Sequence, residues 1–458
     1  MTLITPMRAL LTLAVCLVAP LPVFAQHPTA YTSAVTPGGI RYLYRYDAET
    51  PYAAITFGRV VERALPDTKE ASYGLIPALI FQSADKAGSN EFAERLQDIH
   101  AGASISAGQE EFSVQVKAPA AEFSRALKLV VGALTTAEPA DKPYRRLRLN
   151  AEGAQAQSEV RAETIATRTA YTLTLGNHVI VRQFDAKRYA DTAPADVDLW
   201  RKVVLGRDGL VVAVSGRISD AEAAGAIDAS LGGWPALAAA ARGKNEPIDL
   251  KPQTIVVEQP GRQASILMLG RTGYARGHET EIAGLAMGPL GGGVESRLGD
   301  AVRVALGASY GVGAGIRVID RDQRLIALAT AVDTGKVADS IAAMRKAYER
   351  WQQQGLNDRE MTSQRTRMIG GRDGVFNDPS AANRLVFNAL INDRTLEDVN
   401  GFADRLKALS RDDLNAFIKA KFPRVEELLI VVVTPDAKAL AADCVIKAAA
   451  EALSCKKK

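Results

Sequence analysis

The amino-acid sequence predicts an α+β protein of two homologous domains, each a mostly antiparallel sheet with helices packed on one face. The chain has 458 residues, which is enough for more than one domain. Hydrophobic residues make up 47% and charged residues 24%, as is usual for a soluble globular protein. Strand patterns alternate with amphipathic helical patterns, and their order recurs in the second half, which indicates an internal duplication.

Residues 1–25 have the pattern of a cleaved signal peptide. Arg8 is the only charged residue before an apolar run at 9–18, and Val23-Phe24-Ala25 fits the small-residue cleavage pattern. Cleavage there gives a mature chain that begins at Gln26. The apolar run is too short to span a membrane, and no other run reaches that length. We therefore expect an exported, periplasmic protein without a membrane span.

The first domain is predicted to span residues 26–232, and residues 26–35 are expected to form a flexible lead-in. Apolar residues in alternating or short continuous runs predict strands, and apolar residues at helical spacing predict helices. The predicted strands are Ile40–Tyr46, Ala53–Val61, Glu111–Lys117 and Leu210–Gly216. The predicted helices are 73–84, 91–99, 120–135, 141–173 and 220–231.

Residues 233–253 form the predicted linker, because prolines, glycine and charged residues cluster there. The second domain is predicted to span residues 254–458. Its predicted strands are Ala264–Gly270, Tyr310–Val318 and 428–435, and its predicted helices are 280–290, 337–354 and 411–422.

Two short matches support the duplication. The segment A-A-I-T-F-G at 53–58 parallels A-S-I-L-M-L-G at 264–270. The segment A-G-A-S-I at 101–105 parallels L-G-A-S-Y at 306–310, and each follows a helix and leads into strands and a long helix. The period of about 205 residues is too long for a solenoid repeat, so it indicates two similar halves.

The most informative stretch is 288–310. It divides into a glycine-rich loop at Gly291–Gly293, a short helix, a helix stop at Gly307 and the start of a strand at Tyr310. Arg303 points away from the apolar face of the helix. We therefore expect Arg303 and Tyr310 to project from the same corner, where the helix ends and the strand begins. A cation and a phenol placed together can donate hydrogen bonds to a carbonyl oxygen. The predicted apolar face consists of Leu298, Ala301, Val302, Ala305 and Leu306.

Each member of this pair also has an ordinary explanation. The arginine suits a solvated helix C-terminus, and the tyrosine suits packing at the edge of a strand. An internal comparison favours a further role. Aligning Gly102 with Gly307 puts Asp98 opposite the arginine and Ile105 opposite the tyrosine, so the first half lacks the pair.

The stretch resembles the C-terminal domain of the insulinase-like metallopeptidases, the inverzincins, which include mitochondrial processing peptidase. That family has a glycine loop, then S-R-L, an arginine, and a tyrosine seven residues further on. The resemblance covers nearly all of residues 35–440 and is strongest over 262–435. It implies that Arg303 and Tyr310 bind the substrate backbone. The matching residues are Gly291, Gly292, Gly293, Ser296, Arg297, Leu298, Arg303 and Tyr310.

The zinc motif of this family is missing. An active member needs H-x-x-E-H, in which two histidines bind zinc and the glutamate activates water. Here Pro77 and Phe81 stand at the histidine positions and Ile80 at the glutamate position. None of the three can bind zinc or move a proton, and their apolar character suits a helix packed into a core.

No substitute metal site is evident from the sequence. The histidines are scattered, without a second histidine at a ligand spacing. Three glutamates lie where the family's third ligand falls, and without histidines they are best interpreted as a solvated helix face. The histidines are His27, His100, His178 and His278, and the glutamates are Glu152, Glu159 and Glu163.

The resemblance therefore implies a non-catalytic, substrate-binding subunit of a heterodimeric zinc metallopeptidase that degrades peptides. Zinc is expected in a homologous partner, with no cofactor in this chain and no activity alone. The alternative is a non-enzymatic peptide-binding or scaffold protein of the same fold. A net charge of +4 is too small to favour nucleic acid. The partner, the substrate preference and any opening motion are left open.

Removal of the signal peptide leaves two cysteines, Cys444 and Cys455. An oxidising compartment and an even number favour a disulfide. The intervening residues have a helical pattern, and an unbroken helix would separate the Cα atoms by roughly 16 Å. That distance is far beyond disulfide reach. The sequence leaves this pairing undecided.

Overall fold

The computed structural model describes residues 30–456 except 62–68, 70, 84–90, 109, 177, 238–247, 275, 294, 310 and 439. The predicted signal peptide, the middle of the predicted linker and Tyr310 lie outside the described residues. Within the described part of the chain, no helix combines the length and the apolar character that crossing a membrane requires.

Sheet A contains six strands from the first half, in the order β1-β2-β6-β3-β5-β4. All neighbours are antiparallel except β2 and β6, which are parallel. The strands are β1 (Thr32–Val35), β2 (Arg41–Tyr46), β3 (Tyr52–Val60), β4 (Gly102–Ala107), β5 (Glu111–Pro119) and β6 (Val211–Gly216).

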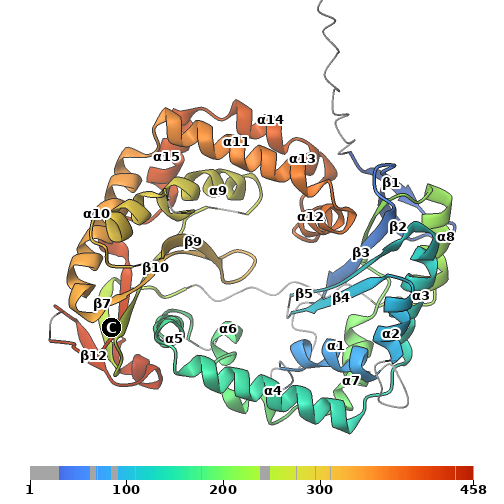
Figure 1. Cartoon of the computed structure of the whole chain (residues 1–458), viewed down its shortest axis with the longest axis horizontal. Helices are drawn as coiled ribbons and strands as arrows, with labels where there is room; N and C mark the ends of the chain where they lie inside the picture. Colours follow the sequence, from blue (N-terminus) through green and yellow to red (C-terminus); the bar gives the residue numbers. More distant parts are fainter. Residues whose placement is uncertain are drawn as a thin grey trace, which may run out of the picture.

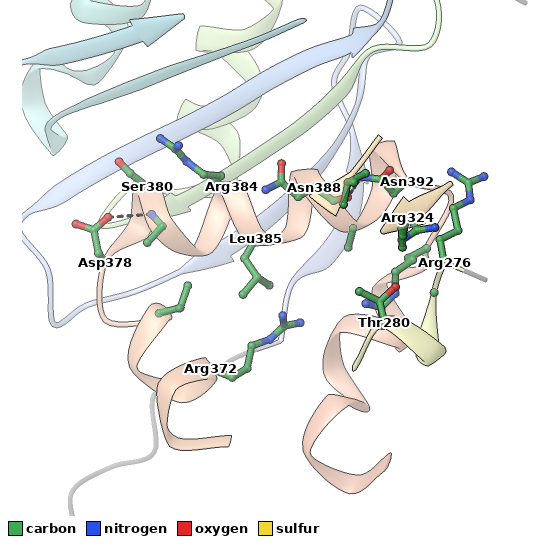
Figure 2. Close-up of a pocket in the computed structure, with 16 residues that line it drawn as sticks. Arg276, Thr280, Arg324, Arg372, Asp378, Ser380, Arg384, Leu385, Asn388 and Asn392 are labelled. Atoms are coloured by element: carbon green, nitrogen blue, oxygen red, sulfur yellow. Dashed lines mark hydrogen bonds between the residues drawn. The ribbon is translucent and has the colours of Figure 1, made fainter. Parts of the chain in front are cut away.

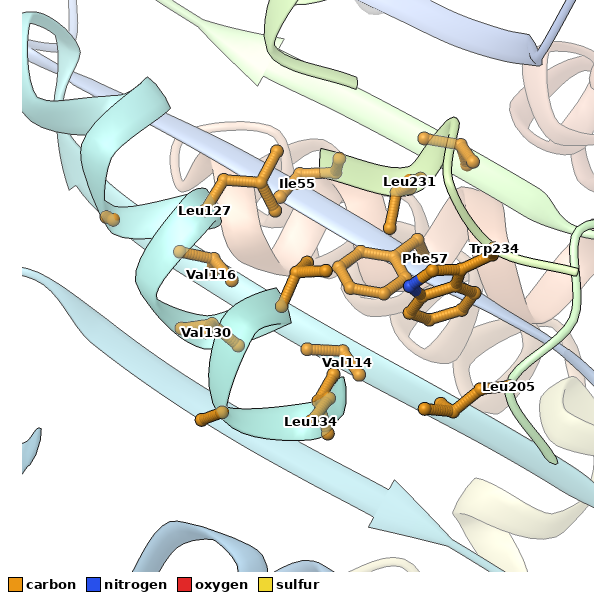
Figure 3. Close-up of a cluster of buried hydrophobic side chains, with 14 of the residues drawn as sticks. Ile55, Phe57, Val114, Val116, Leu127, Val130, Leu134, Leu205, Leu231 and Trp234 are labelled. Carbon is orange, nitrogen blue, oxygen red and sulfur yellow. The ribbon is translucent and has the colours of Figure 1, made fainter. Parts of the chain in front are cut away.

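Most helices of the first half, α5 and α6 excepted, build one core against this sheet. Side chains from α3 meet strand residues such as Val114 and Val116, and Phe57 packs edge-on against Trp234 with ring centroids 5.8 Å apart (Figure 3). The helices are α1 (Ser72–Ser83), α2 (Glu91–Asp98), α3 (Phe123–Thr136), α4 (Asp141–Glu159), α5 (Ala162–Leu175), α6 (Val179–Arg182), α7 (Asp196–Val204) and α8 (Asp220–Leu231).

Sheet B contains six strands from the second half, in the order β12-β7-β11-β8-β10-β9. Alternate residues of its central strand enter different cores, as the two-residue period of a strand requires: Ile266 faces one side and Leu267 the other. The strands are β7 (Gln253–Glu258), β8 (Gln263–Arg271), β9 (Val312–Val318), β10 (Arg324–Asp333), β11 (Leu429–Thr434) and β12 (Cys444–Ile446).

Three helices of the second half match the predicted ranges 280–290, 337–354 and 411–422, whereas the helices between residues 358 and 408 were not predicted. The long helix α10 ends at Gln354, where Gly355 adopts a positive φ of 67°. The helices are α9 (His278–Gly291), α10 (Val337–Gln354), α11 (Asp358–Val375), α12 (Pro379–Ile391), α13 (Leu396–Asn400), α14 (Phe402–Ala408) and α15 (Arg411–Lys421), with a π-helical turn η4 (Gly299–Val304) and a 3-10 segment η7 (Ala449–Cys455).

The strand orders confirm the predicted fold class and its duplication. Five strands of each sheet occur in the same order. If β2 to β6 are replaced by β7 to β11, each by the strand five numbers later, the order of sheet A becomes that of sheet B. The sixth strand differs, because β1 precedes its neighbour β2 and is antiparallel to it, whereas β12 follows β7 and is parallel to it. The two halves therefore share one five-stranded topology, and each has a different sixth strand at one edge.

Each sheet receives a helix from the opposite half, which the sequence did not indicate. Helix α12 of the second half packs on β3 and β6 of sheet A, and α5 of the first half packs on β8 and β11 of sheet B. In Figure 1 the two halves form a curved arrangement, with α12 lying beside β3 and α5 beside the second sheet. The central strands of each sheet are thus covered on both faces.

Two expectations about the ends of the chain were wrong or incomplete. The expected flexible lead-in contains β1, which is anchored by Tyr31 at 3% exposure. Cys444 and Cys455 form a disulfide with Cα atoms 5.7 Å apart. The segment between them is not one helix: it runs as strand β12, then turns back through η7, which brings the two cysteines together.

Candidate substrate-binding corner and the helix that lacks zinc ligands

Helix α1 places the three degenerate motif positions in or against the core of the first half. Pro77 is buried, and Ile80 is only 1% exposed. Phe81 is partly buried and stacks on Phe92 with ring centroids 5.2 Å apart. The three positions that align with the zinc motif in the sequence are thus used for apolar packing.

Two of the three glutamates that follow are engaged by arginines. The Nε atom of Arg148 lies 2.8 Å from Glu152, and an Nη atom of Arg168 lies 3.3 Å from Glu159. Both carboxylates remain about one-third exposed, at 33% and 32%. Among the described residues, no three His, Cys, Asp or Glu side chains gather in a way that could hold a metal ion.

The predicted glycine loop is the C-terminal end of α9. Gly291 is the last helical residue, Gly292 donates its N–H to Gly288 at 2.8 Å, and Gly293 has a φ of 155°. A Cβ atom at Gly291 would lie 2.2 Å from the backbone nitrogen of Ala314 in β9. The glycine therefore permits a close approach between backbones, and here the partner is this chain's own edge strand.

The short helix that follows is a π-helical turn. The N–H of Ala305 donates to the carbonyl of Asp300 at 2.9 Å, five residues back. Leu298 and Val302 are fully buried as predicted, but Ala305 is exposed. The wider turn rotates Ala305 off the face that a regular helical period assigns to it. Such π turns occur frequently at functional sites.

Arg303 lies inside this π turn and is half-buried. Its Nε atom is buried and makes no hydrogen bond to any described residue. Gly307 ends the turn with a φ of 54°, as predicted, and Lys336 donates to its carbonyl at 3.0 Å. Strand β9 then begins at Val312 rather than at Tyr310. The position of Tyr310 relative to the arginine lies outside the described residues.

The internal comparison needs a correction. The helix stop in the first half is His100, whose φ of 52° matches the 54° of Gly307, whereas the sequence alignment used Gly102. A non-glycine residue with positive φ is uncommon, so the glycine was the natural but wrong choice. Matching the two stops puts Leu96, rather than Asp98, opposite the arginine. The first half still lacks a cation at this position.

Comparison with known proteins gives one family match. Residues 194–368 match the family model described as the peptidase M16 inactive domain. M16 peptidases are the insulinase-like peptidases, so this match supports the resemblance seen in the sequence. None of the curated proteins compared with the chain matches it.

Several solved structures share the fold. The peptidase M16 inactive domain from Pseudomonas fluorescens is 17% identical with a TM-score of 0.77, covering 89% of this chain and 98% of that chain. The periplasmic protease PqqL from Escherichia coli is 14% identical with a TM-score of 0.77, covering 89% of this chain and 46% of that one. A protease from Helicobacter pylori is 11% identical with a TM-score of 0.76, covering 88% and 99%. The chain thus has the two-domain fold of M16-like proteins.

Proposed function

We propose that this chain is the non-catalytic, substrate-binding subunit of a heterodimeric zinc metallopeptidase that degrades peptides. The observation that carries the proposal is α1, where Pro77, Ile80 and Phe81 fill the motif positions with packed apolar side chains. The match of residues 194–368 to an inactive peptidase domain supports it. A homologous partner subunit supplies the zinc, and this chain alone has no activity. The signal-peptide pattern supports a periplasmic location for the assembly.

In this proposal Arg303 and Tyr310 hold a backbone carbonyl of the substrate across from the partner's zinc. The buried Nε of Arg303 supports that role, because a buried donor without an acceptor is unfavourable until a ligand oxygen reaches it. The surrounding glycines bring α9 and β9 together and fix the corner from which the arginine projects. Losing one donor of this kind removes roughly 2–4 kcal/mol of transition-state stabilisation.

The test is co-expression of this chain with a homologous chain that has an intact H-x-x-E-H motif. We expect a complex whose peptide cleavage requires zinc. Arg303→Ala and Tyr310→Phe should each lower kcat/KM by about 10²–10³. Arg350→Ala, an exposed arginine on α10, is the matched control and should leave the rate unchanged. Unchanged cleavage in both site variants, or chelator-sensitive proteolysis by this chain alone, would refute the proposal.

The alternative is a peptide-binding or scaffold protein that needs no catalytic partner. It is favoured by a cavity beside α12, whose lining offers both charged and apolar side chains to a peptide. Titration of the isolated chain with an unfolded peptide separates the two. Tight binding, combined with no association with any zinc-bearing homologue, would favour the alternative.

A further inference from the structure

A cavity of about 820 Å³ lies between α12, the end of α11, the start of α9 and the hairpin of β9 and β10. That volume suits a ligand larger than a single inorganic ion. Figure 2 shows α12 crossing the site, with Asp378 and Ser380 at one end and Arg276, Arg324 and Thr280 at the other. The lining includes five arginines: Arg276, Arg324, Arg372, Arg384 and Arg394.

Carboxylates around the cavity are too few to neutralise these cations. Among the described lining residues, Asp378 is the only carboxylate, and Lys117 already pairs with it. Two further carboxylates lie behind the lining, and each is shared by two guanidinium groups. Asp393 pairs with Arg276 and Arg321, and Glu281 pairs with Arg394 and Arg405. The wall of the cavity therefore carries excess positive charge.

Arg324 supplies an unused donor in this wall. The residue is only 7% exposed, and its Nη1 atom makes no hydrogen bond within the part of the chain that the structure describes. Its Nη2 atom reaches the carbonyl of Arg321 at 3.3 Å, and the guanidinium lies 5.7 Å from the ring of Tyr274. A buried guanidinium with a donor left over is unfavourable unless a ligand oxygen accepts from it.

Arg372 is a partly buried member of this group of cations. Burial and, to a smaller extent, repulsion from Arg394 and Arg405 lower its pKa to about 10, while Glu281 and Asp373 act in the opposite direction. Its guanidinium stacks 4.8 Å from the ring of Phe402. Arg372 stays protonated at neutral pH, so an anion bound nearby would relieve repulsion within the group.

The start of α9 adds backbone donors at the same place. Its N-cap is Gly277, with a φ of 96° and no side-chain cap, so the first N–H groups of the helix are not capped by a side chain. Such a helix end favours anions. The first turn also has two carboxylates that do not line the cavity: Glu279 pairs with Lys421 at 2.9 Å, and Glu281 pairs with Arg394 and Arg405.

We propose that this cavity binds the carboxylates of an acidic peptide segment. The proposal rests on the substrate-binding function above and names the chemistry of that substrate. A peptide fits better than a small anion because the arginines are spread along the cavity rather than gathered around one point. Asn388 and Asn392 offer amides that pair with a peptide backbone, and Leu385 and Val375 offer apolar contact between the charges.

The test is fluorescence anisotropy of the full chain with a labelled hexaglutamate peptide and a matched hexaglutamine peptide. We expect hexaglutamate to bind, hexaglutamine to bind at least about ten-fold more weakly, and the difference to shrink as NaCl is raised. Arg276→Gln and Arg384→Gln, whose side chains lie outside the core, should each weaken hexaglutamate binding about ten-fold. Arg411→Gln on α15 is the matched control, and it should bind as the unmodified chain does.

Equal binding of the two peptides, or hexaglutamate binding unchanged in both cavity variants, overturns the proposal. Arginine-dependent binding of inorganic pyrophosphate without binding of hexaglutamate also overturns it, because the site would then take a small anion. Neither zinc nor a partner chain enters this measurement. Its failure would therefore leave the proposed subunit role standing, whereas failure of the subunit role would leave the peptide affinity measurable.

Discussion

The two exchanged helices attach to their sheets by different interactions. Helix α12 is fixed on sheet A by buried hydrogen bonds. Asn383 is fully buried, accepts a hydrogen bond from the Tyr31 hydroxyl at 2.7 Å and donates to the Ala54 carbonyl at 2.8 Å. Ser215 donates to the Pro379 carbonyl at 3.1 Å. We call this contact the α12 seam.

Helix α5 is held on sheet B mainly by apolar packing. Ala170 and Leu173 enter the same cluster as Leu267 and Val431 of the sheet. The Thr174 hydroxyl bonds to Ala170 of its own helix rather than to a strand. We call this contact the α5 seam. Apolar packing tolerates small shifts, whereas paired hydrogen bonds fix position and orientation, so the α12 seam defines the geometry of the cavity beside it.

The largest loss of stability should come from removing a buried side chain in the α5 seam. Leu173 is 4% exposed, so Leu173→Ala should lower the free energy of unfolding by about 2–5 kcal/mol, through lost burial and an unfilled space. Urea denaturation measures this change. Leu149→Ala, at a leucine 66% exposed on α4, is the control and should change stability little. Equal effects of the two substitutions would show that α5 does not depend on its packing.

The disulfide beside the α5 seam should contribute somewhat less. Cys455 is 6% exposed and belongs to the same apolar cluster as α5. Replacing both cysteines by serine should lower stability by about 3 kcal/mol, because a short closed loop is released in the unfolded chain. Thermal unfolding with and without reductant checks this. Reductant should destabilise the native chain and have no further effect on the double variant.

In the α12 seam, Asn383→Ala should lower stability by about 1–3 kcal/mol, because the Tyr31 hydroxyl and the Ala54 carbonyl lose their buried partner. Tyr31→Phe should have a smaller effect. A double-mutant cycle between the two positions should show coupling, since they share one hydrogen bond. Strictly additive effects would contradict a seam fixed by this network.

The smallest effect should come from the ion pair at the rim of the α12 seam. Burial alone would raise the pKa of Asp378, but hydrogen bonds from Lys117 and from the backbone of Ala381 outweigh it and hold the pKa below its usual value. When the pKa of a carboxyl group is lower in the folded than in the unfolded protein, that group stabilises the fold at pH values above its unfolded-state pKa. This stabilisation is lost as the pH falls through the folded-state pKa.

We therefore expect a stability loss below about pH 4 that Lys117→Met reduces, while the backbone hydrogen bond from Ala381 remains. Both side chains are more than one-third exposed, so solvent screening keeps the contribution at neutral pH below about 1 kcal/mol. Denaturation measured between pH 3 and pH 7 in both proteins checks this. An unchanged pH profile in the variant would assign the acid sensitivity to other carboxylates.

Local patterns predicted some of the long elements well, but α11 was not predicted, and the predicted helix 141–173 is two helices, α4 and α5. Helix α10 has the predicted bounds, because its apolar stripe runs unbroken to Gly355. Strand β1 was missed because it is short and polar. Only its pairing with β2 identifies it as a strand, and its own sequence does not. The π turn was missed because the spacing of the buried Leu298 and Val302 also fits a regular α-helix.

Only part of the candidate site could be predicted from the sequence. Pro77, Ile80 and Phe81 were found because they fall within one short motif. The arginines of the cavity are scattered between Arg276 and Arg394 and meet only through tertiary packing. The exchange of α5 and α12 likewise depends on contacts between distant segments, which periodicity within one helix does not report.

The exchange also constrains the order of events at the ribosome. All strands of sheet A are complete at Gly216, but the helix that covers one of its faces ends roughly 175 residues later, on the order of ten seconds at ordinary synthesis rates. During that interval Leu43 and Ala213 have no cover from α12. Nascent chains stalled before α12 should therefore recruit chaperones or aggregate, and release the chaperone once α12 has emerged.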